Sequence, residues 1–206
     1  MVKRDGPRTE TPAMGEPSVQ ASYMKQFAAQ VRTLGVVADD VIAADPELFQ
    51  AIGAAGRMTW MPIEINLRMV DALYTVLGVE RARRFQADQI SRQFDTPLWR
   101  TFVEGGVRLL GLDPGALVRW LPRALALMFR DCGIWTVERD DETSAAMIGR
   151  HLPEVLVAHP HWLDSVAGGI HALFVLCNTS GETRVRECEP ALGQARITIG
   201  WKPGAG

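Results

Sequence analysis

The residues of this chain whose types could do chemistry are led by histidine, and all four histidines fall between positions 151 and 171. His159 and His161 flank Pro160, which favours an extended backbone at His159. An extended segment can present both imidazoles to one metal ion, whereas helical neighbours at this spacing diverge. The candidate ligands are His159, His161 and Cys188, but no third ligand is marked by spacing and no HExxH or CxxC pattern is present. The start of a helix explains His159 and Pro160 more simply, so no metal site is expected.

The three cysteines are an odd number at irregular spacing, which indicates reduced thiols rather than a disulfide framework. Cys132 and Cys177 lie at the ends of apolar helical stretches and are expected in the core. Cys188 stands between Glu187 and Glu189, whose negative charges would raise its pKa. A nucleophilic cysteine is therefore not expected.

Other catalytic and nucleic-acid-binding patterns are missing from the sequence. It has no GxSxG elbow, phosphate-binding glycine loop or dinucleotide fingerprint. Glu64 and Asp71 share one helical face, where solvent exposure explains them better than acid–base catalysis. The chain has 22 basic and 24 acidic residues, so it lacks the basic excess typical of nucleic-acid binding. The cluster Arg81, Arg83 and Arg84 is expected on the solvated face of its helix.

Two kinds of periodicity predict the elements that position these residues. From 18 to 130 the apolar residues repeat at helical spacing, as with Tyr23, Phe27 and Val31. Helices are predicted over residues 18–33, 46–52, 62–77, 80–94, 97–110 and 113–130. Pro122 predicts a kink or a break in the last of them.

From Gly133 onwards the pattern instead predicts a ββαββ unit. Strands are expected from Ile134, over 145–149, 183–187 and 196–201, with a helix over 160–177. Gly168 and Gly169 would let the backbone of that helix approach a neighbour closely. Because four short antiparallel strands need one face covered, the fold predicted is α+β, with a helical N-terminal half packed on a small antiparallel sheet.

The domain organisation predicted is a single α+β domain over 18–201, with a helical part over 18–131 and the ββαββ part over 133–201. Residues 1–17 are expected to be a disordered lead, and residues 202–206 a flexible tail. No stretch of 18 residues is apolar and free of charge, and no secretory h-region is present. We therefore expect a cytoplasmic protein without membrane insertion.

Bulky apolar residues gather on both sides of the change in period. Indole and thioether side chains can line a pocket for an apolar or planar ligand, although they also fill ordinary cores. A pocket is most plausible at the joint between the helical part and the sheet. The residues expected to line it are Trp60, Trp120, Met128, Phe129, Trp135, Trp162 and Phe174.

Four stretches carry a resemblance to known proteins: WMPIEINLRMVDALYTVLG (60–78), LVRWLPRALALMFRDCGIWTVE (117–138), HPHWLDSVAGGIHALFVLC (159–177) and VRECEPALGQARITIGW (185–201). Their order resembles the Myxococcales paralogous family of unknown function. It is more distantly similar to four-vinyl-reductase-type domains, which belong with the heme–nitric-oxide-binding and TRAPP folds. The resemblance implies a sensory or scaffolding module, since members of the wider group bind aromatic effectors, heme or another subunit.

Two family features do not carry over to this chain. Cys188 matches one zinc-binding cysteine of the aromatic-sensing members, but Ala195 and Arg196 occupy the region of the second. A heme-ligating histidine would be expected in the helical half, and the first histidine is His151. The resemblance therefore favours neither zinc nor heme here.

The function predicted is a non-catalytic small-molecule-sensing or protein-interaction module with an apolar pocket and no expected cofactor. Its partners would be an apolar or aromatic small molecule and a second protein subunit, with a homodimer through the first-half helices left open. One alternative is a TRAPP-like scaffold subunit without a ligand. Another is a tetrapyrrole- or metal-dependent enzyme using His159 and His161.

Overall fold

The computed structural model describes residues 15–94, 105 and 113–202. The predicted helix over 97–110, except for residue 105, most of the predicted N-terminal lead and most of the C-terminal tail lie outside these residues. The first half of the chain contains, in order, β1 (Ser18–Gln20), α1 (Ala21–Val31), α2 (Val36–Ala44), α3 (Pro46–Ala54), β2 (Trp60–Pro62), α4 (Glu64–Leu77) and α5 (Val79–Gln93). The helical character predicted for this half is confirmed.

The helices of the first half pack through the stripes that their spacing indicated. Tyr23, Phe27 and Val31 of α1 are all buried, and Phe27 lies against Phe85 of α5 with ring centroids 5.6 Å apart. Pro46 opens α3 after Asp45, whose side chain accepts a hydrogen bond from the backbone N–H of Leu48. Such a cap satisfies one of the otherwise unpaired N–H groups of the first turn.

A small sheet that periodicity did not predict joins the first half to the middle of the chain. Its strand order is β2-β1-β3, with β3 formed by Phe129–Arg130. Val19 of β1 pairs with Met61 on one side and with Phe129 on the other. The predictions of helix at residues 18–20 and from Pro62 were wrong, because strand pairing between distant segments fixes the backbone there. Helix α2 was also missed.

The predicted long helix over 113–130 is broken, as Pro122 indicated. It consists of α7 (Pro114–Leu117), the 3-10 turn η1 (Val118–Trp120) and α8 (Leu121–Met128). Pro122 lies in the first turn of α8, where a missing N–H removes no helical hydrogen bond. The Asp113 side chain caps α7 by accepting a hydrogen bond from the N–H of Ala116 at 2.8 Å.

The second half forms the predicted ββαββ unit around a four-stranded antiparallel sheet of order β4-β5-β7-β6. Its elements are β4 (Ile134–Arg139), β5 (Ser144–Arg150), α9 (Glu154–Val157), α10 (Trp162–Ile170), α11 (Ala172–Leu176), β6 (Gly181–Glu189), the 3-10 turn η2 (Pro190–Leu192) and β7 (Gln194–Trp201). Alternate residues of β7 are buried, including Ile197, Ile199 and Trp201, as expected for a sheet with one covered face. The α+β fold class is confirmed.

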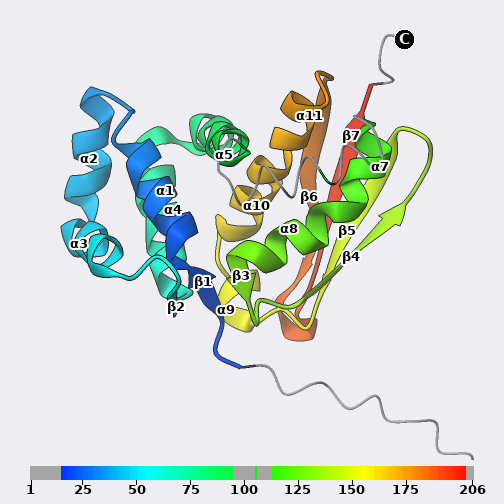
Figure 1. Ribbon diagram of the computed structural model, residues 1–206. Helices are drawn as coiled ribbons and strands as arrows, with labels where there is room; N and C mark the ends of the chain where they lie inside the picture. Colours follow the sequence, from blue (N-terminus) through cyan, green and yellow to red (C-terminus); the bar gives the residue numbers. More distant parts are fainter. Residues whose placement is uncertain (1–14, 95–104, 106–112, 203–206) are drawn as a thin grey trace, which may run out of the picture.

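Helices α8, α10 and α11 lie between the four-stranded sheet and the N-terminal helices (Figure 1). Helices α5 and α10 pack against each other, and two glycines remove side-chain bulk at this contact. A Cβ atom on Gly168 would lie 3.1 Å from the carbonyl oxygen of Arg83, and one on Gly169 would lie 3.3 Å from Cγ1 of Ile90. The predicted role of this glycine pair is confirmed, and α10 thereby becomes the central element between the two halves. Within the described part of the chain, no helix is long and apolar enough to span a membrane.

Candidate ligand cavity

The described helices of both halves border a half-open apolar cavity of about 100 Å³ beside α10. Its walls come from α5, from η1 and α8, and from α10 and α11, with single contributions from α1, α4, α7, β3 and Phe94. Apolar side chains such as Ile90, Leu125, Val166 and Leu173 form most of this surface. None of the described residues that line the cavity belongs to the four-stranded sheet. The cavity therefore lies between helices, and not between the helices and the four-stranded sheet as predicted.

Four polar side chains interrupt the apolar lining: Tyr23, Asn66, Gln86 and Ser165. Asn66 is held at both ends of its amide. Its Oδ1 accepts a hydrogen bond from Trp162 Nε1 at 3.2 Å, and its Nδ2 lies 3.6 Å from Sδ of Met24. Asn66 therefore orients the Trp162 indole and has little capacity left for a ligand.

The other three polar side chains have no such partners. Gln86 is 1% exposed, and its Nε2 has no hydrogen-bond partner among the described residues. No hydrogen bond joins the hydroxyl of Tyr23 or that of Ser165 to the described residues. Burial raises the pKa of Tyr23 far above its usual value, so the group at the cavity is a neutral phenol.

The seven predicted pocket residues are divided between this cavity and a neighbouring hollow. Trp120, Met128, Phe129 and Trp162 line the cavity. Trp60 and Trp135 instead line the second hollow, of about 530 Å³, to which Phe129 and Trp162 also contribute. Phe174 lines neither; it is buried beside Gly181 and packs edge-on against His171.

The second hollow is more polar and surrounds the turn between β3 and β4. Arg130 lies over the ring of Trp60 at 4.2 Å, and Trp135 Nε1 donates to the carbonyl oxygen of Cys132 at 3.3 Å. Burial raises the pKa of the Cys132 thiol to about 12, so the thiol stays protonated. Polar groups that line this hollow thus already interact with one another.

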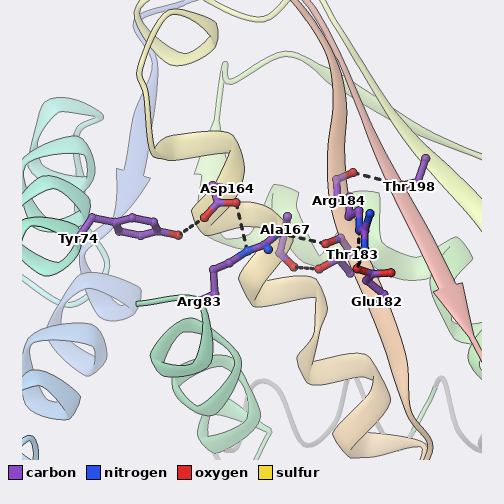
Figure 2. A network of polar contacts seen from close by, with 8 residues as sticks. All are labelled: Tyr74, Arg83, Asp164, Ala167, Glu182, Thr183, Arg184 and Thr198. Atoms are coloured by element: carbon purple, nitrogen blue, oxygen red, sulfur yellow. Dashed lines mark hydrogen bonds and ion pairs between the residues drawn. The ribbon is translucent and has the colours of Figure 1, made fainter. Parts of the chain in front are cut away.

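A polar network occupies a different side of α10 (Figure 2). The Tyr74 hydroxyl donates to Asp164 Oδ2 at 2.9 Å, and Arg83 Nε lies 3.1 Å from Asp164 Oδ1 as an ion pair. Arg83 Nη2 also donates to the carbonyl oxygen of Thr183 at 3.0 Å, and the Thr183 hydroxyl donates to that of Ala167 at 2.8 Å. The network joins α4, α5, α10 and β6.

The structure corrects the expected position of one arginine. Arg81 and Arg84 are exposed as predicted, but the Arg83 side chain is 26% exposed and makes the contacts just described. No local sequence signal predicts these contacts, because Asp164 and Thr183 are distant from Arg83 in the chain. Burial, and secondarily the charge of Arg83, lowers the pKa of His171.

The predicted metal candidates do not converge in the described residues. His159 Nε2 lies 3.2 Å from the Asp71 carboxylate, while its Nδ1 accepts the backbone N–H of His161. The Cys188 thiol donates to the carbonyl oxygen of Val157, and Cys188 pairs across the β6–β7 hairpin with Ala195. No three His, Cys, Asp or Glu side chains among the described residues are grouped to hold a metal ion.

Comparison with known proteins gives the fold a counterpart. No protein family model and no curated protein matches the chain. The Fe(II) unliganded H-NOX protein from K. algicida is 14% identical with a TM-score of 0.59, over 91% of this chain and 98% of that chain. A point mutant of the T. tengcongensis H-NOX protein is 12% identical with a TM-score of 0.59, over 91% of this chain and 100% of that chain. The chain has the H-NOX fold.

The heme associated with that fold does not fit the residues present. Heme iron is held by His, Cys, Met or Tyr side chains. Of these types, only Tyr23 and Met128 are among the described residues that line the cavity, and Tyr23 is held neutral by burial. Residues 95–112 contain no His, Cys, Met or Tyr. A cavity of about 100 Å³ is also smaller than the pockets of about 300 Å³ or more that hold drug-sized ligands.

Proposed function

We propose that this protein is a non-catalytic sensing module that binds a small apolar molecule in the cavity around α10. The observation that carries the proposal is the half-open cavity itself, whose described lining is almost entirely apolar side chains from helices of both halves. Burying apolar ligand surface there would contribute about 25 cal/mol for each Å² removed from water. A ligand would thus stabilise the contact between the halves.

The position of α10 supports a sensing role. Ser165 and Val166 line the cavity, while Asp164 belongs to the network that reaches α4, α5 and β6. A ligand that moves α10 would therefore change contacts on both sides of the molecule. The H-NOX neighbours include a structure that concerns the molecular mechanism of H-NOX activation, at 12% identity and a TM-score of 0.54. A sensing role on the same fold is consistent with that neighbour.

The lining favours binding over catalysis. No His, Cys, Asp, Glu, Lys or Arg is among the described residues around the cavity, so the Tyr23 and Ser165 hydroxyls have no adjacent base to activate them. A heme-dependent activity would require a strong axial ligand, and the described lining offers only the Met128 thioether, without a His or Cys beside it, and the neutral phenol of Tyr23. Sensing without heme is the function that these residues support.

Several finer features belong to the same proposal. The pocket residues would be Trp120, Met128, Phe129 and Trp162, with Trp60, Trp135 and Phe174 supporting the walls. The protein would be a homodimer through first-half helices, would act in the cytoplasm with reduced cysteines, and would be a relative of the Myxococcales paralogous family. The single-domain limits 18–201 also remain part of the proposal.

The test is a ligand-dependent melting temperature across a panel of small, neutral, apolar compounds. A ligand at 100 times its Kd stabilises by about 2.7 kcal/mol, which for a chain of this size raises Tm by roughly 5–10 °C. Ala124→Leu on α8 places a larger side chain at the cavity and should abolish the shift. Ala126→Leu on the same helix lies at the second hollow and should preserve it. A panel without any shift, or a shift that survives Ala124→Leu, would overturn the proposal.

A further inference from the structure

We infer that the ligand of this cavity is a neutral, single-ring or similarly small molecule with an apolar body and one hydrogen-bond-accepting oxygen of the carbonyl type. The inference rests on the proposed function and names the chemical class of its ligand. It comes from the polar groups of the wall that the protein leaves without partners. The central group is the amide of Gln86.

Gln86 is placed on the inner side of α5, one helical turn from Ala82, which is also fully buried. The side chain of Gln86 is 1% exposed, lines the cavity, and makes no hydrogen bond through its Nε2. Buried amides in native proteins are almost always hydrogen-bonded, and leaving one unpaired carries a desolvation penalty. A side-chain amide can turn either its N–H or its oxygen toward a ligand, since rotation by half a turn exchanges them.

Two hydroxyls from other elements also line the cavity. Tyr23 comes from α1 and Ser165 from α10, and neither hydroxyl is hydrogen-bonded to the described residues. Both can donate a hydrogen bond, and so can the amide of Gln86. A carbonyl oxygen has two lone pairs and can accept from two donors at once. Because the atom of Gln86 that lacks a partner is the donor Nε2, these three potential donors favour an acceptor oxygen on the ligand.

The same cavity lining disfavours charged ligands, and the cavity volume limits the size of a neutral ligand. None of the described residues that line the cavity is charged, so a carboxylate or an ammonium group would be buried without a counter-ion. The volume of about 100 Å³ is somewhat below that of an engineered apolar cavity of about 150 Å³ that binds benzene. A six-membered ring is therefore the appropriate scale for a probe.

The experiment compares two ring compounds of nearly the same shape, cyclohexanone and methylenecyclohexane. Each is titrated into the full chain, and Kd is taken from backbone amide shifts in two-dimensional NMR. Gln86→Met replaces the amide with a thioether of similar length, and Tyr23→Phe removes only a hydroxyl. For each protein we take the ratio of the two Kd values. Because the hydration of each probe is the same for every variant, a change in this ratio between the unaltered protein and a variant reports only the contribution of the altered side chain.

We expect Gln86→Met to weaken cyclohexanone relative to methylenecyclohexane by about ten-fold, or about 1.4 kcal/mol. Tyr23→Phe should shift the ratio in the same direction. If both probes bind and the ratio is unchanged in both variants, the ligand class is wrong while the apolar cavity stands as a binding site. If neither probe binds the unaltered protein, the ligand class and the proposed function both fail. Tyr23→Phe keeps the comparison decisive if Gln86→Met does not fold.

Discussion

The two sides of α10 differ in how completely their polar groups are paired. On one side Asp164 accepts a hydrogen bond from Tyr74 and an ion pair from Arg83, and Thr183 completes the link to the sheet. On the cavity side Gln86 Nε2 has no partner among the described residues. Two adjacent residues, Asp164 and Ser165, therefore have opposite roles: the first positions the helix, and the second borders a space that other atoms can enter.

This difference separates what maintains the fold from what is available for binding. A network of hydrogen bonds and ion pairs in a low-dielectric setting fixes relative positions, because each lost partner leaves another group unpaired. In this network Arg83 Nε makes the ion pair with Asp164 but no hydrogen bond. An apolar cavity with unpaired polar groups lowers stability and is retained where a ligand can restore the missing contacts. Substitutions on the network side should consequently reduce stability, whereas those on the cavity side should mainly alter ligand selectivity.

The largest effect is expected from Asp164→Ala. It removes the acceptor of the Tyr74 hydrogen bond and the counter-ion of Arg83 together, leaving Arg83 with the carbonyl of Thr183. Since the two charged side chains are each about one-quarter exposed, we expect a loss of about 2 kcal/mol in the free energy of unfolding. Urea denaturation followed by circular dichroism measures it.

Ser165→Ala is the matched control, one residue away on the same helix. Its hydroxyl is not hydrogen-bonded to the described residues, so its removal should change the unfolding free energy by less than about 0.5 kcal/mol. Equal losses in the two variants would show that both sides of α10 are equally important for stability and would remove the basis of the comparison.

Gln86→Met is expected to act in the opposite direction in the absence of ligand. It removes a buried amide without a partner for Nε2 and retains most of the side-chain volume. We expect a gain of about 1 kcal/mol in unfolding free energy, measured by the same denaturation experiment. A clear loss of stability would instead indicate that this amide is already satisfied in the folded protein.

The two buried tyrosines allow the same substitution, Tyr→Phe, to be compared on the two sides of α10, with smaller expected changes in unfolding free energy. Tyr74→Phe removes a hydrogen bond of 2.9 Å to Asp164 and should cost about 1 kcal/mol. Tyr23→Phe removes a hydroxyl that has no hydrogen bond to the described residues and should cost less than about 0.3 kcal/mol. Thermal unfolding of both variants measures the difference, and the reverse order would contradict the assignment of paired and unpaired sides.

The sequence predicted the elements whose signal is local. Repeating apolar residues predicted α1, α3, α4 and α5 of the first half, although α2 was missed. Alternation predicted the strands of the ββαββ unit, and Pro122 predicted the break before α8. Strands β1, β2 and β3 were missed because each has only two or three residues and depends on partners far along the chain. Short segments of that kind carry no periodicity of their own.

The candidate site was predicted less completely. Trp120, Met128, Phe129 and Trp162 line one cavity, while ligand binding by these residues stays a prediction. Gln86 was missed because α5 is polar overall, although its spacing from Ala82 places it on the buried stripe. Arg83 was missed because its partner Asp164 comes from another half of the chain.

The smallest expected effect is a pH dependence at the edge of the network. Burial, with a smaller contribution from Arg83, lowers the pKa of His171 below its usual value of 6.5. Between the folded pKa and 6.5 the unfolded chain therefore binds more protons than the folded one, so this residue makes stability rise with pH across that window. Lowering the pH from 7.5 to 5 should thus weaken the protein through His171, and His171→Asn should reduce the slope of unfolding free energy against pH. If the two slopes coincide, the environment of His171 does not distinguish its protonation states, and the network edge is more open to water than its contacts indicate.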